Sequence, residues 1–280
     1  MKASDFPVNF PEKLTAAVTA QLSEPAIAIQ FLEAAESAET IEGAGGLPEF
    51  EYDAVADQKY RVGRGMIQKY RNRLLLIAHS RCAVHCRYCF RRHFDYAQDT
   101  FQEEDIELLC RHLEAHPEID EVILSGGDPL MLSNQRLDTL IGVLYQREGV
   151  KRIRLHSRVL TVLSRRINTK FIALCQRYRS KLLIVTHINH ASEIDEKAGQ
   201  VIRQLGDLGI RLLNQSVLLR GVNDDAMVLN QLSDKLFTLG VMPYYLNLLD
   251  RVKGAEHFYI TDEKAKDIYR ELAEITSGYL

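Results

Sequence analysis

Three of the five cysteines lie close together, at positions 82, 86 and 89. The C-x3-C-x2-C spacing of Cys82, Cys86 and Cys89 places three thiol groups on one short loop. Three thiolates can hold three corners of a [4Fe–4S] cluster and leave the fourth iron open for another ligand. The alternatives are a zinc site with His85 or His93 as fourth ligand, or a chance grouping. The spacing favours the iron–sulfur cluster.

A glycine turn is the second candidate feature. The sequence Ser-Gly-Gly-Asp-Pro at 125–129 follows the apolar run EVIL. Two adjacent glycines allow a backbone to approach a ligand closely. An ordinary strand-to-helix turn would use the same residue types. Because the cysteine loop precedes it, we interpret this turn as a ligand-binding turn.

The elements that must position these residues repeat along the chain. After the first apolar run at 74–80, further runs begin at 121, 150, 181, 210 and 241, a period of about 30 residues that matches one βα unit. We predict strands over 74–80, 121–127, 150–157, 181–189, 210–219 and 241–249. We predict helices over 103–116, 134–148, 168–180, 193–209, 224–240 and 261–278.

Alternating strands and helices predict an α/β fold with a parallel sheet. The pattern alone is consistent with a doubly wound sheet or a barrel. Six units suit a partial (βα)6 TIM-like barrel better than a closed barrel, which needs about eight. Residues 61–280 would form this barrel, and residues 1–60 a helical lead-in with helices over 14–22 and 25–41. Polar residues follow each predicted strand, as in His156-Ser157-Arg158 and His187 to His190.

Composition limits the function classes. The 280 residues carry a net charge of −3, which argues against general nucleic-acid binding. No apolar run approaches the roughly 20 residues of a membrane helix, and the first residues lack the apolar core of a signal peptide. Five cysteines at low density do not suggest a secreted disulfide scaffold. We therefore expect a cytoplasmic protein, with Cys110 and Cys175 as buried core thiols.

Several long motifs occur in the order of a known family. They are Cys-Ala-Val-His-Cys-Arg-Tyr-Cys-Phe-Arg-Arg-His-Phe at 82–94, Ser-Gly-Gly-Asp-Pro-Leu at 125–130, His-Ile-Asn-His at 187–190, Asn-Gln-Ser-Val-Leu-Leu-Arg at 214–220 and Pro-Tyr-Tyr-Leu at 243–246. The chain thus resembles the radical S-adenosylmethionine (SAM) superfamily. Within it, the chain resembles the lysine 2,3-aminomutase family, in the branch that makes β-lysine for elongation factor P.

The resemblance implies an isomerase that uses a [4Fe–4S] cluster, SAM and pyridoxal phosphate (PLP) to convert L-α-lysine to β-lysine. It implies an electron donor such as flavodoxin or ferredoxin. The cluster ligands would be Cys82, Cys86 and Cys89, and the substrate-binding residues Arg91 for the carboxylate and Asp250 for the ε-ammonium. The SAM-binding residues would be Ser125, Gly126, Gly127, Asp128, His190 and Gln215, and the PLP phosphate segment Lys69, Tyr70 and Arg73.

The family pattern continues beyond the segment that matches 277–280, where a second substrate-binding aspartate and the PLP Schiff-base lysine follow. We therefore expect a truncated form that holds the cluster and SAM and binds PLP weakly. Two alternatives remain: a radical SAM enzyme of another reaction class without PLP, or a non-enzymatic metal-binding scaffold. Product stereochemistry and homo-oligomer formation are not decided by the sequence.

Overall fold

The computed structural model describes residues 11–33 and 47–280. One eight-stranded sheet runs in the order β1 to β8. The strands are β1 Arg61–Gly63, β2 Met66–Tyr70, β3 Arg73–His79, β4 Glu121–Gly126, β5 Arg152–Ser157, β6 Leu182–Thr186, β7 Arg211–Val217 and β8 Val241–Asn247. Strands β1, β2 and β3 pair antiparallel, whereas β3 to β8 form a parallel ladder.

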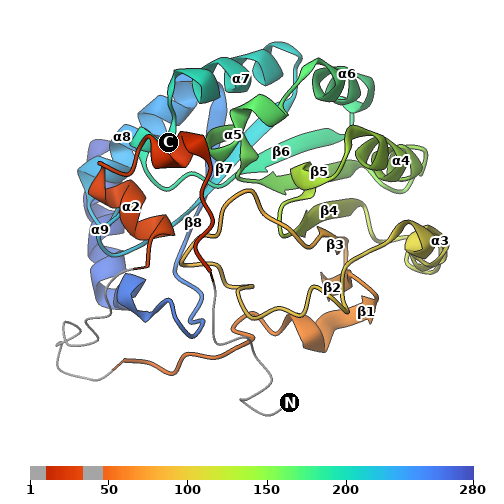
Figure 1. The fold of residues 1–280 in the computed structure, drawn as a ribbon, viewed down its shortest axis with the longest axis horizontal. Helices are drawn as coiled ribbons and strands as arrows, with labels where there is room; N and C mark the ends of the chain where they lie inside the picture. Colours follow the sequence, from red (N-terminus) through yellow and green to blue (C-terminus); the bar gives the residue numbers. More distant parts are fainter. Residues whose placement is uncertain (1–10, 34–46) are drawn as a thin grey trace.

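The parallel part confirms the predicted partial barrel. All six predicted strands are present, and the sheet curves without closing, with β1 and β8 at its edges (Figure 1). The β1–β2 hairpin is an addition that the sequence analysis missed, because its short strands are partly exposed and lack a continuous apolar run. The sheet is therefore mixed rather than purely parallel.

Helices cover the outer face of the parallel strands (Figure 1). They are α3 Ile106–Ala115, α4 Asn134–Tyr145, α6 Thr169–Tyr178, α7 Glu196–Asp207, α8 Ala226–Thr238 and α9 Asp262–Ile275, while the short α5 Val159–Val162 follows β5 and packs beside the cysteine loop. Five of them begin after a polar residue whose side chain accepts a hydrogen bond from a first-turn N–H, namely Ser133, Asn168, Asp195, Asp225 and Thr261. Such N-caps satisfy donors that a helix leaves unpaired and fix where each helix starts.

Short 3-10 helices occupy several loops: η3 Asp57–Tyr60, η4 Glu103–Asp105, η5 Pro129–Met131, η6 Ser164–Arg166, η7 Ala191–Glu193 and η8 Glu256–Phe258. No helix in residues 11–33 and 47–280 is both long and apolar enough to cross a membrane.

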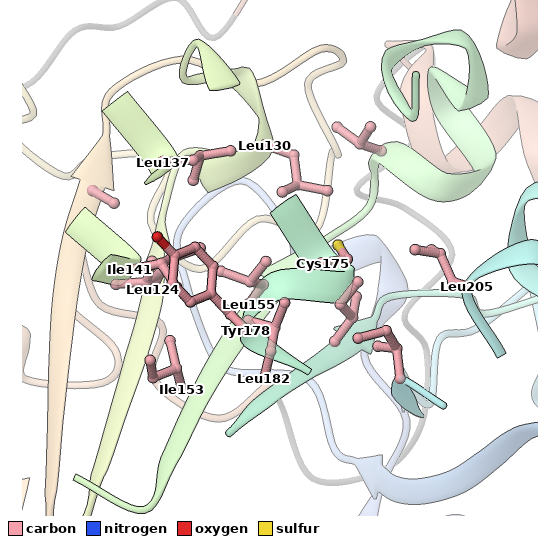
Figure 2. Packing of buried hydrophobic residues seen from close by; sticks show 14 of the residues in the cluster. Leu124, Leu130, Leu137, Ile141, Ile153, Leu155, Cys175, Tyr178, Leu182 and Leu205 are labelled. Carbon is pink, nitrogen blue, oxygen red and sulfur yellow. The ribbon is translucent and has the colours of Figure 1, made fainter. Parts of the chain in front are cut away.

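The main core lies between the sheet and the outer helices. Leu124 and Leu155 on the strands face Ile141 and Tyr178 on α4 and α6 (Figure 2). Cys175 belongs to this core, as predicted. The same prediction is wrong for Cys110, which is only half-buried. It lies on the flank of α3 beside the partly exposed Arg147, rather than under the helix.

The lead-in contains two short helices, α1 Ala16–Thr19 and α2 Pro25–Phe31. Ile27 and Phe31 of α2 pack against Ala83 and Val84 of the cysteine loop in a separate apolar cluster. The predicted helix over 25–41 is thus confirmed only to Phe31, and residues 34–46, including the glycine run at 43–46, lie outside the described ranges. The lead-in supports the cysteine loop directly.

Candidate functional site

The cysteine loop follows β3, at the carboxyl edge of the parallel sheet. All three thiols are half-buried. Burial, reinforced by the neighbouring Cys89 and Cys86, raises the pKa of the Cys82 thiol. Burial and the nearby Cys86 raise the pKa of Cys89 to about 11. Because the pKa of Cys82 responds to Cys86 and Cys89, and that of Cys89 responds to Cys86, the three sulfur atoms lie within electrostatic range of one another.

This donor set fits an iron–sulfur cluster. Among the described residues, no three His, Cys, Asp or Glu side chains are grouped closely enough to bind one metal ion. A cluster of four irons binds each cysteine at a separate corner, so its ligands stand further apart. Thiols with raised pKa values bind as thiolates only when strong positive charge stabilises them, and metal coordination supplies that charge. Cys82, Cys86 and Cys89 together could therefore hold the cluster.

The glycine turn packs against the chain that enters the cysteine loop. The N–H of Gly127 donates to the His79 carbonyl over 2.7 Å, and the N–H of Asp128 donates to the Arg81 carbonyl over 2.9 Å. Gly126 has a φ of 119°, a conformation that other residues rarely adopt. A Cβ atom on Gly127 would lie 2.6 Å from the Arg81 carbonyl oxygen. Both glycines are therefore required by the close backbone approach.

The Asp128 carboxylate ties this turn to the end of β5. It accepts hydrogen bonds from the Ser157 hydroxyl at 2.8 Å and from the Arg158 N–H at 2.9 Å. Burial raises the pKa of Asp128 to about 6, although these bonds oppose the change. The structure thus uses the side chain of Asp128 to fix the neighbouring loops, while Ser125 and the glycines present backbone at the sheet edge.

A charge cluster lies beside the turn, formed by Asp57, Lys69, Arg91 and Asp250. The Asp57 carboxylate bridges two cations, at 2.8 Å from Arg91 Nε and 2.7 Å from Lys69 Nζ. Arg91 Nη1 also donates to the Ser125 hydroxyl over 3.1 Å. Although burial opposes it, the two cations lower the pKa of Asp57. Asp57 of η3 and Ser125 of β4, which are far apart in sequence, therefore meet at Arg91.

Asp250, which follows β8, completes this charge cluster. Desolvation of its carboxyl group raises the pKa of Asp250, while Lys69 and Arg91 oppose the rise. The carboxylate therefore lies within electrostatic range of both cations. The arrangement brings one predicted substrate-binding cation and one predicted substrate-binding anion to the same place.

The predicted PLP segment is divided between two places. Lys69 points to the charge cluster. Tyr70 and Arg73 instead pair across the β2–β3 turn, and the Arg73 guanidinium lies 4.0 Å from the centre of the Tyr70 ring. The Tyr70 residue is 58% exposed. Arg73 begins β3, whereas the cysteine loop follows its other end, so these two residues lie far along the strand from the thiols.

Two histidines face Gln215 in the interior of the curved sheet. Gln215 Nε2 lies 3.5 Å from His156 Nδ1 and also contacts the ring of His187. Burial is the main cause that lowers the pKa of His187 to about 3, with help from the positive charges of Arg158 and Arg91. Burial likewise lowers the pKa of His156. Both rings are therefore neutral near neutral pH, and Gln215 is held in the interior.

His190 lies outside this interior group. Its ring Nδ1 accepts from the Ser192 N–H over 3.2 Å and caps η7. The residues predicted to bind SAM thus lie in three places: the glycine turn, the interior of the curved sheet at Gln215, and the start of η7 at His190.

The two half-buried histidines in the interior of the sheet predict a loss of stability in acid. An unfolded histidine binds a proton below about pH 6.5, whereas folded His187 stays neutral until about pH 3, so folding stability falls as the pH drops through this window. Between pH 7 and pH 5, the unfolding free energy of the unsubstituted chain should fall further than that of the His187→Gln variant, by up to about 2 kcal/mol. Urea unfolding at the two pH values measures this difference. Equal pH dependence in the His187→Gln variant and the unsubstituted chain would contradict the assignment.

Comparison with known proteins places this chain in a family. The radical SAM superfamily model matches residues 76–165. The L-lysine 2,3-aminomutase of Escherichia coli is 47% identical over 233 residues, covering 83% of this chain and 68% of that protein. The chain belongs to the lysine 2,3-aminomutase family. The Haemophilus influenzae member is 46% identical over 231 residues, covering 82% of this chain and 68% of its own length.

Solved structures support the fold assignment. SuiB from Streptococcus suis superposes with a TM-score of 0.56 at 10% identity, covering 77% of this chain and 49% of that protein. A second structure of SuiB, bound to S-adenosylmethionine, gives a TM-score of 0.52 at 11% identity, covering 69% and 42%. At this identity the likeness concerns the fold, and it agrees with the open six-unit barrel of a radical SAM isomerase family.

Several residues at the site were missed by sequence reasoning. Asp57 lies in the segment assigned to the lead-in, with no motif around it, yet it bridges Arg91 and Lys69. Gln30 and Glu193 are fully buried and reach the cysteine loop through Arg158. The only available signal was the place of Arg158 directly after a predicted strand.

Proposed function

We propose that this chain is an L-lysine 2,3-aminomutase that isomerises L-α-lysine to β-lysine. The identity of 47% to the E. coli enzyme over 233 residues is the observation that carries the proposal. The site supports it, because three thiols, a glycine turn and a pair of opposite charges meet at one sheet edge. In the branch of the family that the sequence motifs resemble, the product would serve the modification of elongation factor P.

Each cofactor has residues that could hold it. Cys82, Cys86 and Cys89 would bind a [4Fe–4S] cluster, and the backbone at Ser125, Gly126 and Gly127 would approach SAM. Gln215 would contact SAM from the interior of the curved sheet, and His190 from the loop that it caps before η7. Of the residues predicted to bind the PLP phosphate, Lys69 would meet it at the charge cluster, whereas Tyr70 and Arg73 lie at the β2–β3 turn. When bound, these groups supply the radical chemistry and the support for amino-group migration.

The chain's own residues would bind and orient lysine. Arg91 presents a planar guanidinium, which suits bidentate binding of the substrate carboxylate. This contact would compete with Asp57, which bonds Arg91 over 2.8 Å in the present arrangement. Asp250 would bind the ε-ammonium at the other end of the substrate. Neutral His156 and His187 face Gln215 in the interior of the curved sheet and would add no charge there.

A direct assay tests this proposal. Anaerobically reconstituted protein, reduced by dithionite or by a flavodoxin or ferredoxin, should form β-lysine from L-lysine when SAM and PLP are present. Mass spectrometry identifies the product, and iron and sulfide analysis counts the cluster. The Cys86→Ala variant should lose most iron and all turnover, whereas Cys175→Ala should keep the cluster. A brown, fully loaded protein that consumes SAM without forming β-lysine would point to another radical SAM reaction.

A further inference from the structure

Arg158 contacts a predicted cluster ligand directly. Its Nη1 donates to the Cys86 sulfur over 2.9 Å and also bonds the Tyr88 hydroxyl. Its Nη2 donates to Gln30 Oε1 and to Glu193 Oε2, both over 2.7 Å. The residue is 7% exposed. A charged group is thus held in a fixed, buried place against one of the three thiols.

Three separate segments hold this guanidinium in place. Gln30 comes from α2, Tyr88 from the cysteine loop, and Glu193 from η7, while Arg158 itself follows β5. The aromatic rings of Phe31 and Tyr88 lie 4.5 Å and 5.4 Å from its central carbon. Arginine keeps its positive charge at every pH at which proteins fold. Its effect on Cys86 is therefore a permanent field rather than a switch.

Glu193 is the buried counter-charge. One carboxylate oxygen bonds Arg158, and the other accepts from the N–H groups of Asn189 at 2.9 Å and His190 at 3.1 Å. Gln30 Nε2 lies 3.3 Å from the same oxygen. The Glu193 carboxylate is therefore anchored to the loop after β6. Of the pair Arg158 and Glu193, only Arg158 contacts the Cys86 sulfur.

This arrangement has a consequence for electron uptake by a bound cluster. Reduction adds one electron from a low-potential one-electron donor and makes the cluster and its thiolates more negative, with no bond formed or broken. Hydrogen bonds to the sulfur atoms and nearby positive charge favour the more negative state and raise the reduction potential. Nearby negative charge has the opposite effect. Arg158 and Glu193 should therefore act in opposite directions.

We propose that Arg158 is a positioning residue that raises the reduction potential of the cluster through its bond to the Cys86 sulfur, and that Glu193 limits this effect. The inference rests on the proposed function only in that Cys86 must be a cluster ligand. It also explains why α2 is tied to the barrel through the buried Gln30.

The test measures the midpoint potential of the reconstituted protein without SAM or lysine, by titration with a low-potential donor and electron paramagnetic resonance. In Arg158→Gln, the ratio of reduced to oxidised cluster at a fixed potential should fall about tenfold, which equals about 59 mV for a one-electron couple. In Glu193→Gln, the same ratio should rise. Arg166→Gln is the matched control, because Arg166 bonds the carbonyls of Leu130 and Leu132 instead of a thiol.

Equal potentials in the unsubstituted chain and Arg158→Gln, at equal iron content, would overturn the inference. So would shifts of the same sign in Arg158→Gln and Glu193→Gln. If Arg158→Gln does not take up iron, Glu193→Gln decides alone: a raised potential supports the inference and an unchanged one rejects it. The expected shifts with no β-lysine formed would reject the proposed function but leave this inference standing. An unsubstituted chain that binds no cluster would reject both.

Discussion

Replacement of Arg91 with glutamine should lower kcat/KM for L-lysine by two to three powers of ten. Removing one partner of a buried, hydrogen-bonded charge pair costs about 2–5 kcal/mol, and each 1.36 kcal/mol is tenfold in rate. Arg91 is 7% exposed and is held between Asp57 and Ser125. The loss should appear mainly as a higher KM, because carboxylate binding stabilises substrate and transition state alike.

The conservative variant separates charge from geometry. Arg91→Lys keeps the charge but lacks the planar fork, so it should recover only part of the activity. Arg177→Gln is the control, since Arg177 forms an exposed surface pair with Asp138 at 2.8 Å. Iron content and SAM binding should be unchanged in all three variants. An Arg91→Gln enzyme with normal KM for lysine would show that the carboxylate binds elsewhere.

The sequence predicted the barrel well because its signals are local. Continuous apolar runs such as Leu182–Thr186 are buried on both faces, and a polar N-cap precedes five of the outer helices. The β1–β2 hairpin escaped because Arg61–Gly63 is three residues long and largely exposed. Cys110 was wrongly placed in the core because a helical apolar pattern does not distinguish the buried face from its flank.

The candidate site was predictable only where one motif contains the whole feature. Cys82, Cys86 and Cys89 are such a feature, and so is the turn at Gly126 and Gly127. Contacts made by residues far apart in the chain left no pattern. Asp57 meets Arg91 across 34 positions, and Gln30 meets Arg158 across 128. Their partners are set by the way the barrel curves, which spacing along the sequence does not encode.

The Gly127→Ala variant should fail to hold the cysteine loop in place. An added Cβ would lie 2.6, 2.7 and 2.8 Å from the carbonyl oxygen, carbonyl carbon and amide nitrogen of Arg81. All three are backbone atoms, so no side-chain rotation relieves the clash. Overpacking of this kind costs about 1–3 kcal/mol. Because Arg81 directly precedes Cys82, the displaced chain carries the first thiol with it. We expect a lower melting temperature, reduced iron content and weaker SAM binding.

Gly149→Ala is the matched control for this prediction. A Cβ at Gly149 would meet nothing within 4 Å, and its φ is not positive. The same substitution there should leave stability unchanged within about 0.5 kcal/mol, or raise it slightly by restricting the unfolded chain. Calorimetry, iron analysis and SAM titration on both variants measure the contrast. If Gly127→Ala bound iron and SAM as well as Gly149→Ala does, the glycine turn and the cysteine loop would be able to move apart without loss of iron or SAM binding. Their close backbone contact would then be a feature of packing alone, and the ligand-binding assignment of the glycine turn would fail.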